Sequence, residues 1–136
     1  GVASKKFIEL AGEASEGILL PVGKIVVADQ IPDADPQKKV LMEYRDAYEK
    51  EFNEPVSTFG GHAWDAMLII TSALEDLFEE GEEVTRESIK DRIESTSGLA
   101  GVAGVYTFSD TDHNGLNSDG LVMVEVKNGD WRLASQ

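Results

Sequence analysis

The 136-residue sequence lacks cysteine altogether and has few basic side chains. Without cysteine, the chain can form no disulfide, no thiolate zinc site and no cysteine nucleophile. Its 12 basic residues stand against 26 acidic ones, which gives a formal net charge of −14. So few cations cannot neutralise phosphates, which argues against nucleic acids and anionic membrane surfaces as partners. No apolar run approaches the roughly 20 residues that a membrane helix needs.

The sequence also lacks the motifs that indicate an enzyme or a metal site. The two histidines, His62 and His113, lie in different segments and form no H-x-x-x-H pattern. A G-x-S-x-G nucleophile elbow is absent, as is a glycine-rich phosphate loop followed by Lys-Ser/Thr. We therefore expect no catalytic residue, no metal ion and no cofactor.

Hydrophobic residues make up 41% of the chain, which is typical of a domain with a packed core. Helical spacing of apolar residues predicts four helices, which begin after Ser4, at Pro36, at about Gly61 and after Thr85. We expect the third helix, to about Phe78, to be packed on several sides because it is apolar over most of its circumference.

Short apolar runs rich in β-branched residues predict strands at residues 17–21, 24–28, 101–108 and 122–127. Asn128-Gly129 is the strongest hairpin signal in the chain, because both residue types accept a positive φ. Helices placed between short apolar strands predict an α/β fold with a C-terminal β-hairpin.

The loop from Asp110 to Gly115 has two interpretations. Asp110, Asp112 and Asn114 alternate as in a calcium loop, with Gly115 at the sharp turn. The twelfth loop position should be glutamate but is Leu121, and the flanking residues favour strands over helices. We favour a turn stabilised by aspartate and asparagine side chains.

The stretch Phe59-Gly60-Gly61-His62 also has two interpretations. The first interpretation is a turn in which the glycines supply flexible backbone before the helix starts. Alternatively, it is part of a binding site, because a helix N-terminus offers N–H groups and positive potential beside the Phe59 ring. The residues alone favour the turn, since helix starts are common and binding sites are few.

Four blocks of sequence follow one another in the chain: GVASKKFIELAGEASEGILLP, DADPQKKVLMEYRDAYEKEFNEPVSTFGGHAWDAMLII, GLAGVAGVYTFSDTDHNGL and LVMVEVKNGDWRLA. In sequence and order, these blocks resemble the branched-chain amino-acid (Leu/Ile/Val-type) binding proteins of ABC importers. The resemblance covers almost the whole chain and implies a partial type I periplasmic binding protein with two Rossmann-like lobes. Full members are more than twice this length, so it implies a C-terminal fragment, and the absence of an initiator methionine fits an excised or mature piece.

The resemblance further implies a division of the chain between the lobes. Residues 1–22 would end the second lobe, residues 23–118 would complete the first, and residues 119–136 would return to the second as a hairpin. In such proteins a small solute is enclosed between the lobes by a hinge motion. Phe59 matches a position that lines the solute pocket, with Gly60, Gly61 and His62 beside it. The groups that bind the α-carboxylate and α-ammonium of an amino acid would lie in segments that this sequence does not contain.

The resemblance therefore implies an extracytoplasmic solute-binding component of an ABC importer, and not an enzyme. Its partners would be an amino acid or similar small solute and a membrane permease. The location would be periplasmic or extracellular, with an upstream lipid anchor as one option. The isolated chain is expected to self-associate or swap domains, because surfaces that the missing strands cover would be open. A ligand-sensing domain of a receptor or regulator is the first alternative, and a hydrolase or amidase on a similar scaffold is the last.

Overall fold

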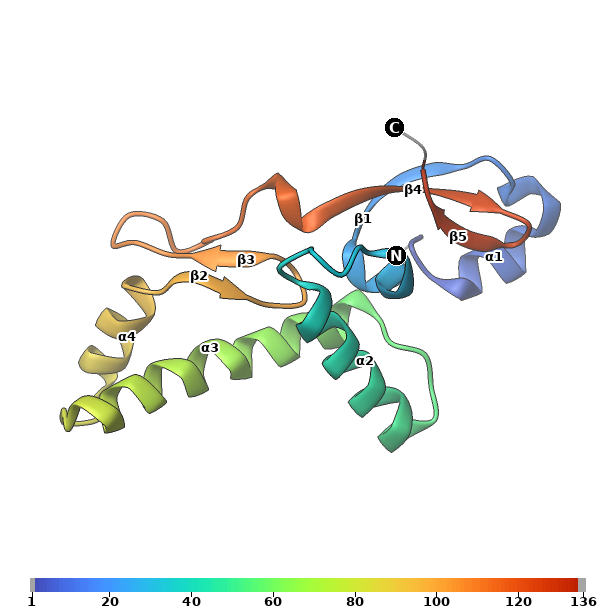
Figure 1. Cartoon of the computed structure of the whole chain (residues 1–136). Helices are drawn as coiled ribbons and strands as arrows, with labels where there is room; N and C mark the ends of the chain where they lie inside the picture. The colour runs from blue at the N-terminus through green and yellow to red at the C-terminus, as the bar shows by residue number, and fades with distance from the viewer. Residues whose placement is uncertain (1, 135–136) are drawn as a thin grey trace.

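The computed structural model describes residues 2–134 and contains two groups of elements joined by two connections (Figure 1). The elements are α1 (Lys5–Ala11), η1 (Gly12–Ser15), β1 (Leu19–Gly23), η2 (Lys24–Gln30), α2 (Lys38–Phe52), α3 (Thr58–Glu80), α4 (Arg86–Glu94), β2 (Ser97–Ala100), β3 (Val105–Thr107), η3 (Ser118–Gly120), β4 (Leu121–Lys127) and β5 (Asp130–Leu133). The predicted mixture of helices and strands is confirmed.

The first group, the sheet group, contains α1, η1 and an antiparallel sheet with strand order β1-β4-β5. Leu20 pairs with Val124, so the sheet joins the beginning of the chain to its end. The predicted hairpin is confirmed, with Asn128 and Gly129 at φ values of 56° and 73°. The Glu16 carboxylate accepts hydrogen bonds from both of their backbone N–H groups, at 2.9 and 2.6 Å.

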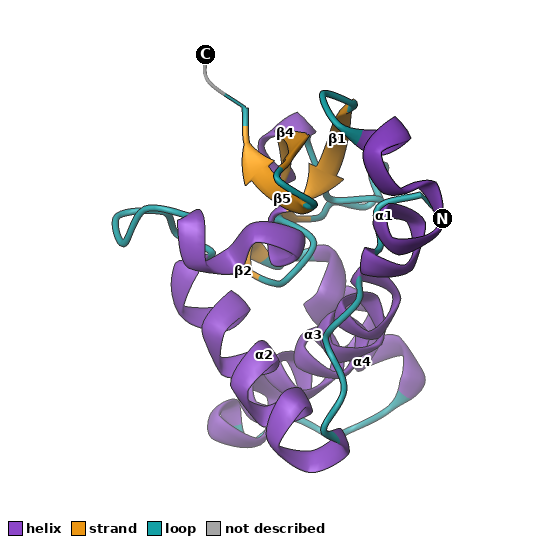
Figure 2. Cartoon of the chain, turned by 90° about the vertical axis from the view of Figure 1, so that its right-hand side faces the viewer, coloured by secondary structure: helices purple, strands orange, loops and turns teal. Residues whose placement is uncertain are grey.

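The second group, the helix group, contains α2, α3, α4 and the β2–β3 hairpin, and it lies at the opposite end of the molecule (Figure 2). The predicted cap of α4 is confirmed as a reciprocal pair: Ser88 N donates to Thr85 Oγ1 at 3.0 Å, and Thr85 N donates to Ser88 Oγ at 2.9 Å. Helix α3 begins at Thr58, about three residues earlier than predicted, because Ser57 caps it and accepts a hydrogen bond from Gly60 N at 3.4 Å.

Two sequence-based expectations were wrong about strands. Residues 24–28 form the 3₁₀ segment η2 and not a strand. The Gln30 side chain at the end of η2 bonds to β5, donating to Trp131 O at 3.0 Å and accepting from Leu133 N at 2.9 Å. Residues 101–108 do not form one strand either, because the chain turns at residues 101–104 between β2 and β3.

The main core cluster contains residues of both groups, including Val22, Leu41, Tyr44 and Val124. In α1, Ile8 is buried, whereas Leu10 is 78% exposed. Within the described residues, no helix has the length and apolar character to cross a membrane. Two connections join the groups: the first connection (residues 24–37) links β1 to α2, and the second connection (residues 108–120) links β3 to β4.

Candidate functional site

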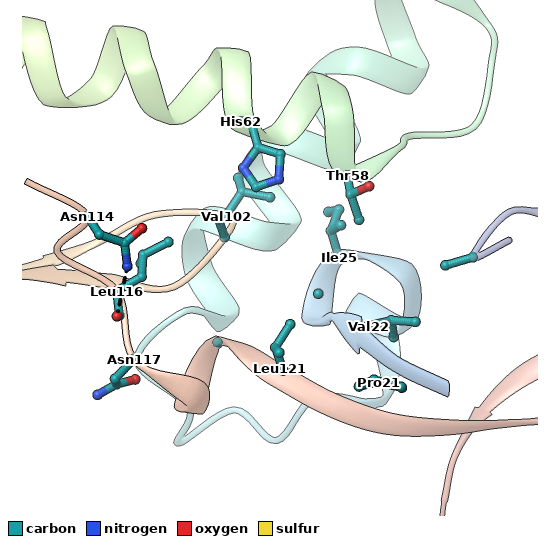
Figure 3. A pocket seen from close by; sticks show the side chains of 14 residues that line it. Pro21, Val22, Ile25, Thr58, His62, Val102, Asn114, Leu116, Asn117 and Leu121 are labelled. Atoms are coloured by element: carbon teal, nitrogen blue, oxygen red, sulfur yellow. Dashed lines mark hydrogen bonds between the residues drawn. The ribbon is translucent and has the colours of Figure 1, made fainter. Parts of the chain in front are cut away.

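A cavity of about 450 Å³ lies where the two groups and both connections meet (Figure 3). The α3 side chains of Thr58 and His62 point into it from one side, and Val22, Ile25 and Leu121 border it on the other (Figure 3). Its lining residues are Ala3, Pro21, Val22, Gly23, Ile25, Thr58, His62, Val102, Ala103, Asn114, Leu116, Asn117, Gly120 and Leu121. The cavity volume is in the range of small-molecule sites.

The lining is mainly apolar, with a few neutral hydrogen-bonding groups. Thr58, His62, Asn114 and Asn117 supply its polar side chains, and none of its described lining residues is Asp, Glu, Lys or Arg. The Asn114 amide donates to Leu116 O at 3.2 Å, which orients this side of the cavity. Such a surface can hold an apolar group and a neutral polar group, but it offers no counter-charge for an ionised one.

The four residues predicted as a site have different positions. His62 lines the cavity, whereas Phe59 is 73% exposed and is not among the lining residues. Gly60 and Gly61 lie in the first turn of α3 itself, and not in a turn that precedes the helix. A Cβ at Gly60 would collide with the Tyr44 hydroxyl, and one at Gly61 would lie 2.6 Å from Val102 Cγ1. The two glycines therefore allow α2 and the cavity wall to approach α3 closely.

The cavity wall at residues 101–104 is organised by Asp65 of α3. Asp65 is 1% exposed. Its carboxylate accepts from Val102 N at 2.6 Å, from Ala103 N at 2.8 Å and from the Tyr106 hydroxyl at 3.0 Å. Burial raises the pKa of Tyr106 well above its ordinary value, and the negative charge and hydrogen bond of Asp65 raise it further.

Gln37 and the wall residues were not predicted from the sequence as part of a site. The Gln37 side chain is buried and donates to Gly101 O at 2.9 Å and to Val102 O at 3.2 Å. The sequence contains two weak signals for these residues. Glycines stand at both ends of the wall, Gly101 and Gly104, and a glutamine directly precedes an amphipathic helix. Neither pattern indicates that the two segments meet.

The loop from Asp110 to Gly115 forms the favoured turn. Asp112 Oδ1 accepts from Asn114 N at 2.9 Å and from Gly115 N at 3.2 Å. His113 lies apart from the cavity and contacts Glu94, with 3.0 Å between Nε2 and Oε1. In residues 2–134, no three His, Asp or Glu side chains converge closely enough to hold a metal ion.

Comparisons with family profiles and with curated proteins give no match, whereas solved structures match closely. An extracellular ligand-binding receptor from Rhodopseudomonas palustris HaA2 is 29% identical over 97% of this chain, with a TM-score of 0.84. A protein assigned to branched-chain amino acid ABC transport in Rhodospirillum rubrum is 32% identical over 96% of this chain, with a TM-score of 0.70. An ABC transporter substrate-binding protein from Desulfitobacterium hafniense, in complex with Leu, is 18% identical over 95% of this chain and has a TM-score of 0.56. This last likeness concerns the fold alone.

The matched region spans 38%, 34% and 39% of those three chains, respectively. The partial type I periplasmic binding protein fold implied by the sequence resemblance is thereby confirmed. The named structures are ligand-binding and transport proteins. The chain therefore has a partial type I periplasmic binding protein fold, is similar to extracellular ligand-binding receptors and branched-chain amino-acid binding proteins, and spans a little over a third of the length of the matched chains.

Proposed function

We propose that this chain is part of an extracytoplasmic protein that binds an amino acid or similar small solute between two lobes and delivers it to an ABC permease. The observation that carries the proposal is the cavity at the junction of the two groups and both connections, in a chain whose structural relatives are solute-binding proteins. The sheet group corresponds to one lobe and the helix group to the other. The lobe assignments are then residues 1–22 and 119–136 against residues 23–118.

The mechanism is lobe closure without covalent chemistry. A solute shifts the equilibrium between open and closed forms only by the difference between its affinities for the two. The cavity supplies apolar contacts and the His62 side chain as a polar contact. It has no counter-charge among its described lining residues, so the charged groups of an amino acid must be neutralised by segments outside this chain.

Phe59 remains in the proposal as an apolar wall that is completed only on closure. It lies three residues before His62 on the same helix, so the two side chains lie on neighbouring parts of the α3 surface. Its ring is 73% exposed here. Contact with a solute or with the opposing lobe would remove this apolar surface from water, which favours the closed form.

Calorimetric titration of the 136-residue chain tests where the charged-group anchors lie. With leucine, isoleucine, valine and polar amino acids, we expect no binding or dissociation constants of about 1 mM or weaker, equivalent to roughly 4 kcal/mol. Micromolar binding would show that this chain holds sufficient anchors itself.

A chimera tests the function directly. This chain replaces the matching segment of the Rhodopseudomonas palustris receptor, and the product is screened with amino acids and related acids after cooperative unfolding has been verified. We expect micromolar binding of at least one solute, which His62→Ala weakens about tenfold, equivalent to 1.4 kcal/mol. Thr71→Ala, at an exposed α3 position that does not line the cavity, is the matched control. A folded chimera that binds no solute would contradict the proposal.

A ligand-sensing module is the second candidate, because one structural relative is named as an extracellular ligand-binding receptor. Both roles use the same solute cavity, and they differ in what the closed form contacts. A longer sequence with an export signal and no further domain favours transport, whereas a fused helix-turn-helix or membrane helix favours sensing. Location outside the cytoplasmic membrane, with or without a lipid anchor, is part of the transport proposal.

A further inference from the structure

The backbone of the wall at residues 101–104 is hydrogen-bonded through both its N–H groups and its carbonyl groups. Asp65 accepts the N–H groups of Val102 and Ala103, and Gln37 donates to the carbonyl groups of Gly101 and Val102. Asp65 and Gln37 are each 1% exposed. If one partner of such a buried bond is removed, the other polar group is left without a hydrogen bond, because water cannot replace the lost partner. The conformation of the wall therefore depends on these two side chains.

The same bonds continue into the first connection. Gln37 N donates to Asp35 Oδ1 at 2.9 Å, and Asp35 Oδ2 accepts from Lys24 Nζ at 2.8 Å. The Lys24 side chain is 9% exposed and that of Asp35 is 18% exposed. Lys24 directly follows Gly23, which lines the cavity at the end of β1. A continuous polar network thus runs from the end of β1 to the cavity wall.

The second connection contacts the same wall by close packing. A Cβ at Gly120 would collide with Ala103 O, and a Cβ at Gly104 would lie 2.6 Å from Leu116 Cδ2. Leu116 and Gly120 both line the cavity. Both connections therefore contact the wall, the first through the hydrogen bonds of Gln37 and the second through the packing of Leu116 and Gly120.

We propose that Gln37 and Asp65 are positioning residues that couple the cavity wall at residues 101–104 to the first connection through Asp35 and Lys24. A change in the backbone path at Lys24 then moves Val102 and Ala103, which line the cavity, without any contact between Lys24 and the solute. The network would make solute affinity depend on the geometry of the connection. This last consequence rests on the proposed function, whereas the coupling itself does not.

Hydrogen exchange measured by NMR on the full chain tests the coupling without a solute. Lys24→Met keeps a long side chain but removes the ion pair with Asp35. We expect exchange of the Val102 and Ala103 amides to accelerate at least tenfold. The β4 amides of Val124 and Val126 should accelerate by no more than about threefold, because they report global opening.

Lys38→Met is the matched control, because it removes bonds from Lys38 Nζ to the carbonyl groups of Ala28 and Asp29 in the same connection but outside the network. It should leave exchange of Val102 and Ala103 within twofold of the wild type. Equal acceleration at the wall and in β4, or no difference between the two lysine variants, would overturn the coupling.

Gln37→Leu keeps the test decisive if Lys24→Met does not fold. This variant retains the backbone donor to Asp35 and loses only the side-chain donors to the wall. The same tenfold acceleration is expected at Val102 and Ala103, and unchanged rates would refute the proposal. Accelerated exchange in a chain whose chimera binds no solute would leave the coupling intact and reject the solute-binding function instead.

Discussion

A single carboxylate, that of Asp65, determines the local structure of the cavity wall. It is buried and accepts three hydrogen bonds, two of them from backbone N–H groups of adjacent residues. The acceptors that water would otherwise provide are excluded here, so the wall has no alternative partner at hand. The residue that organises the candidate site is thus one that does not line it.

Replacement of Asp65 should therefore be costly. We expect Asp65→Ala to lower the free energy of unfolding by about 3 kcal/mol, because it leaves the buried Val102 N–H, the half-buried Ala103 N–H and the Tyr106 hydroxyl without their acceptor. Urea denaturation followed by circular dichroism measures the change. Asp76→Ala, at an exposed position on the same helix, is the control and should change stability by no more than about 0.5 kcal/mol. A similar loss in both variants would mean that the wall contacts contribute little.

The raised pKa of Tyr106 leads to a prediction of how stability changes at alkaline pH. Burial, and then the charge and hydrogen bond of Asp65, raise its pKa above the ordinary 10.0. Above pH 10 the unfolded chain releases this proton while the folded chain retains it, so stability should fall as pH rises. Thermal unfolding between about pH 8 and pH 11 measures this fall, which Tyr106→Phe should make shallower. An equally steep fall in the variant would assign the effect to other groups, of which Tyr44, with its raised pKa, is one.

At the scale of elements, local sequence signals succeeded where the backbone itself selects the structure. The Asn128-Gly129 turn and the Thr85 cap of α4 depend on φ values and on hydrogen bonds between near neighbours. The prediction of a strand at residues 24–28 was wrong. Their β-branched composition favours a strand, whereas the bonds that Gln30 and Lys24 make to residues elsewhere in the chain favour η2. Propensity was overridden by tertiary contacts.

Two glycines give predictions of opposite sign: Gly129 in the turn of the hairpin and Gly23 at the end of β1. Gly129 has φ +73° and open space around it, so Gly129→Ala should cost about 1 kcal/mol from backbone strain alone. Gly23 has φ −63°, and a Cβ there meets only Thr58 Cγ2 at an ordinary 3.6 Å. Gly23→Ala should therefore stabilise the chain by about 0.5 kcal/mol through the unfolded state. Chemical denaturation of both variants measures the difference, and equal signs would contradict the conformational argument.

At the scale of the whole molecule, the expectation that α3 packs on several sides was wrong for this chain. Phe59, Met67, Ile70 and Phe78 recur at helical spacing on one face of α3 and are 73%, 60%, 41% and 70% exposed. Within residues 2–134, no element covers this face of the helix. Exposed apolar patches of this kind mark surfaces for association.

We propose that the chain on its own self-associates through this face of α3. The net charge of −14 opposes association, so salt should strengthen it by screening the repulsion. Light scattering over a concentration series at about 0.5 M salt, where the Debye length is only a few Å, should show species larger than a monomer. Met67→Glu should weaken the association, whereas Met123→Glu, at a half-exposed position on β4, should not. A monomer at every concentration would contradict the proposal.

The sequence alone determined the α/β class, the helices, the C-terminal hairpin and, through ordered blocks of resemblance, the partial type I periplasmic binding protein fold. These features depend on periodicity, caps and turn residues, which act between near neighbours. Only the tertiary structure decided that His62 enters the cavity while Phe59 stays outside it, and that Gln37 and Asp65 hold the wall between them. Gln37 and its partner Gly101 are 64 residues apart in sequence, and no local pattern specifies a contact at that separation.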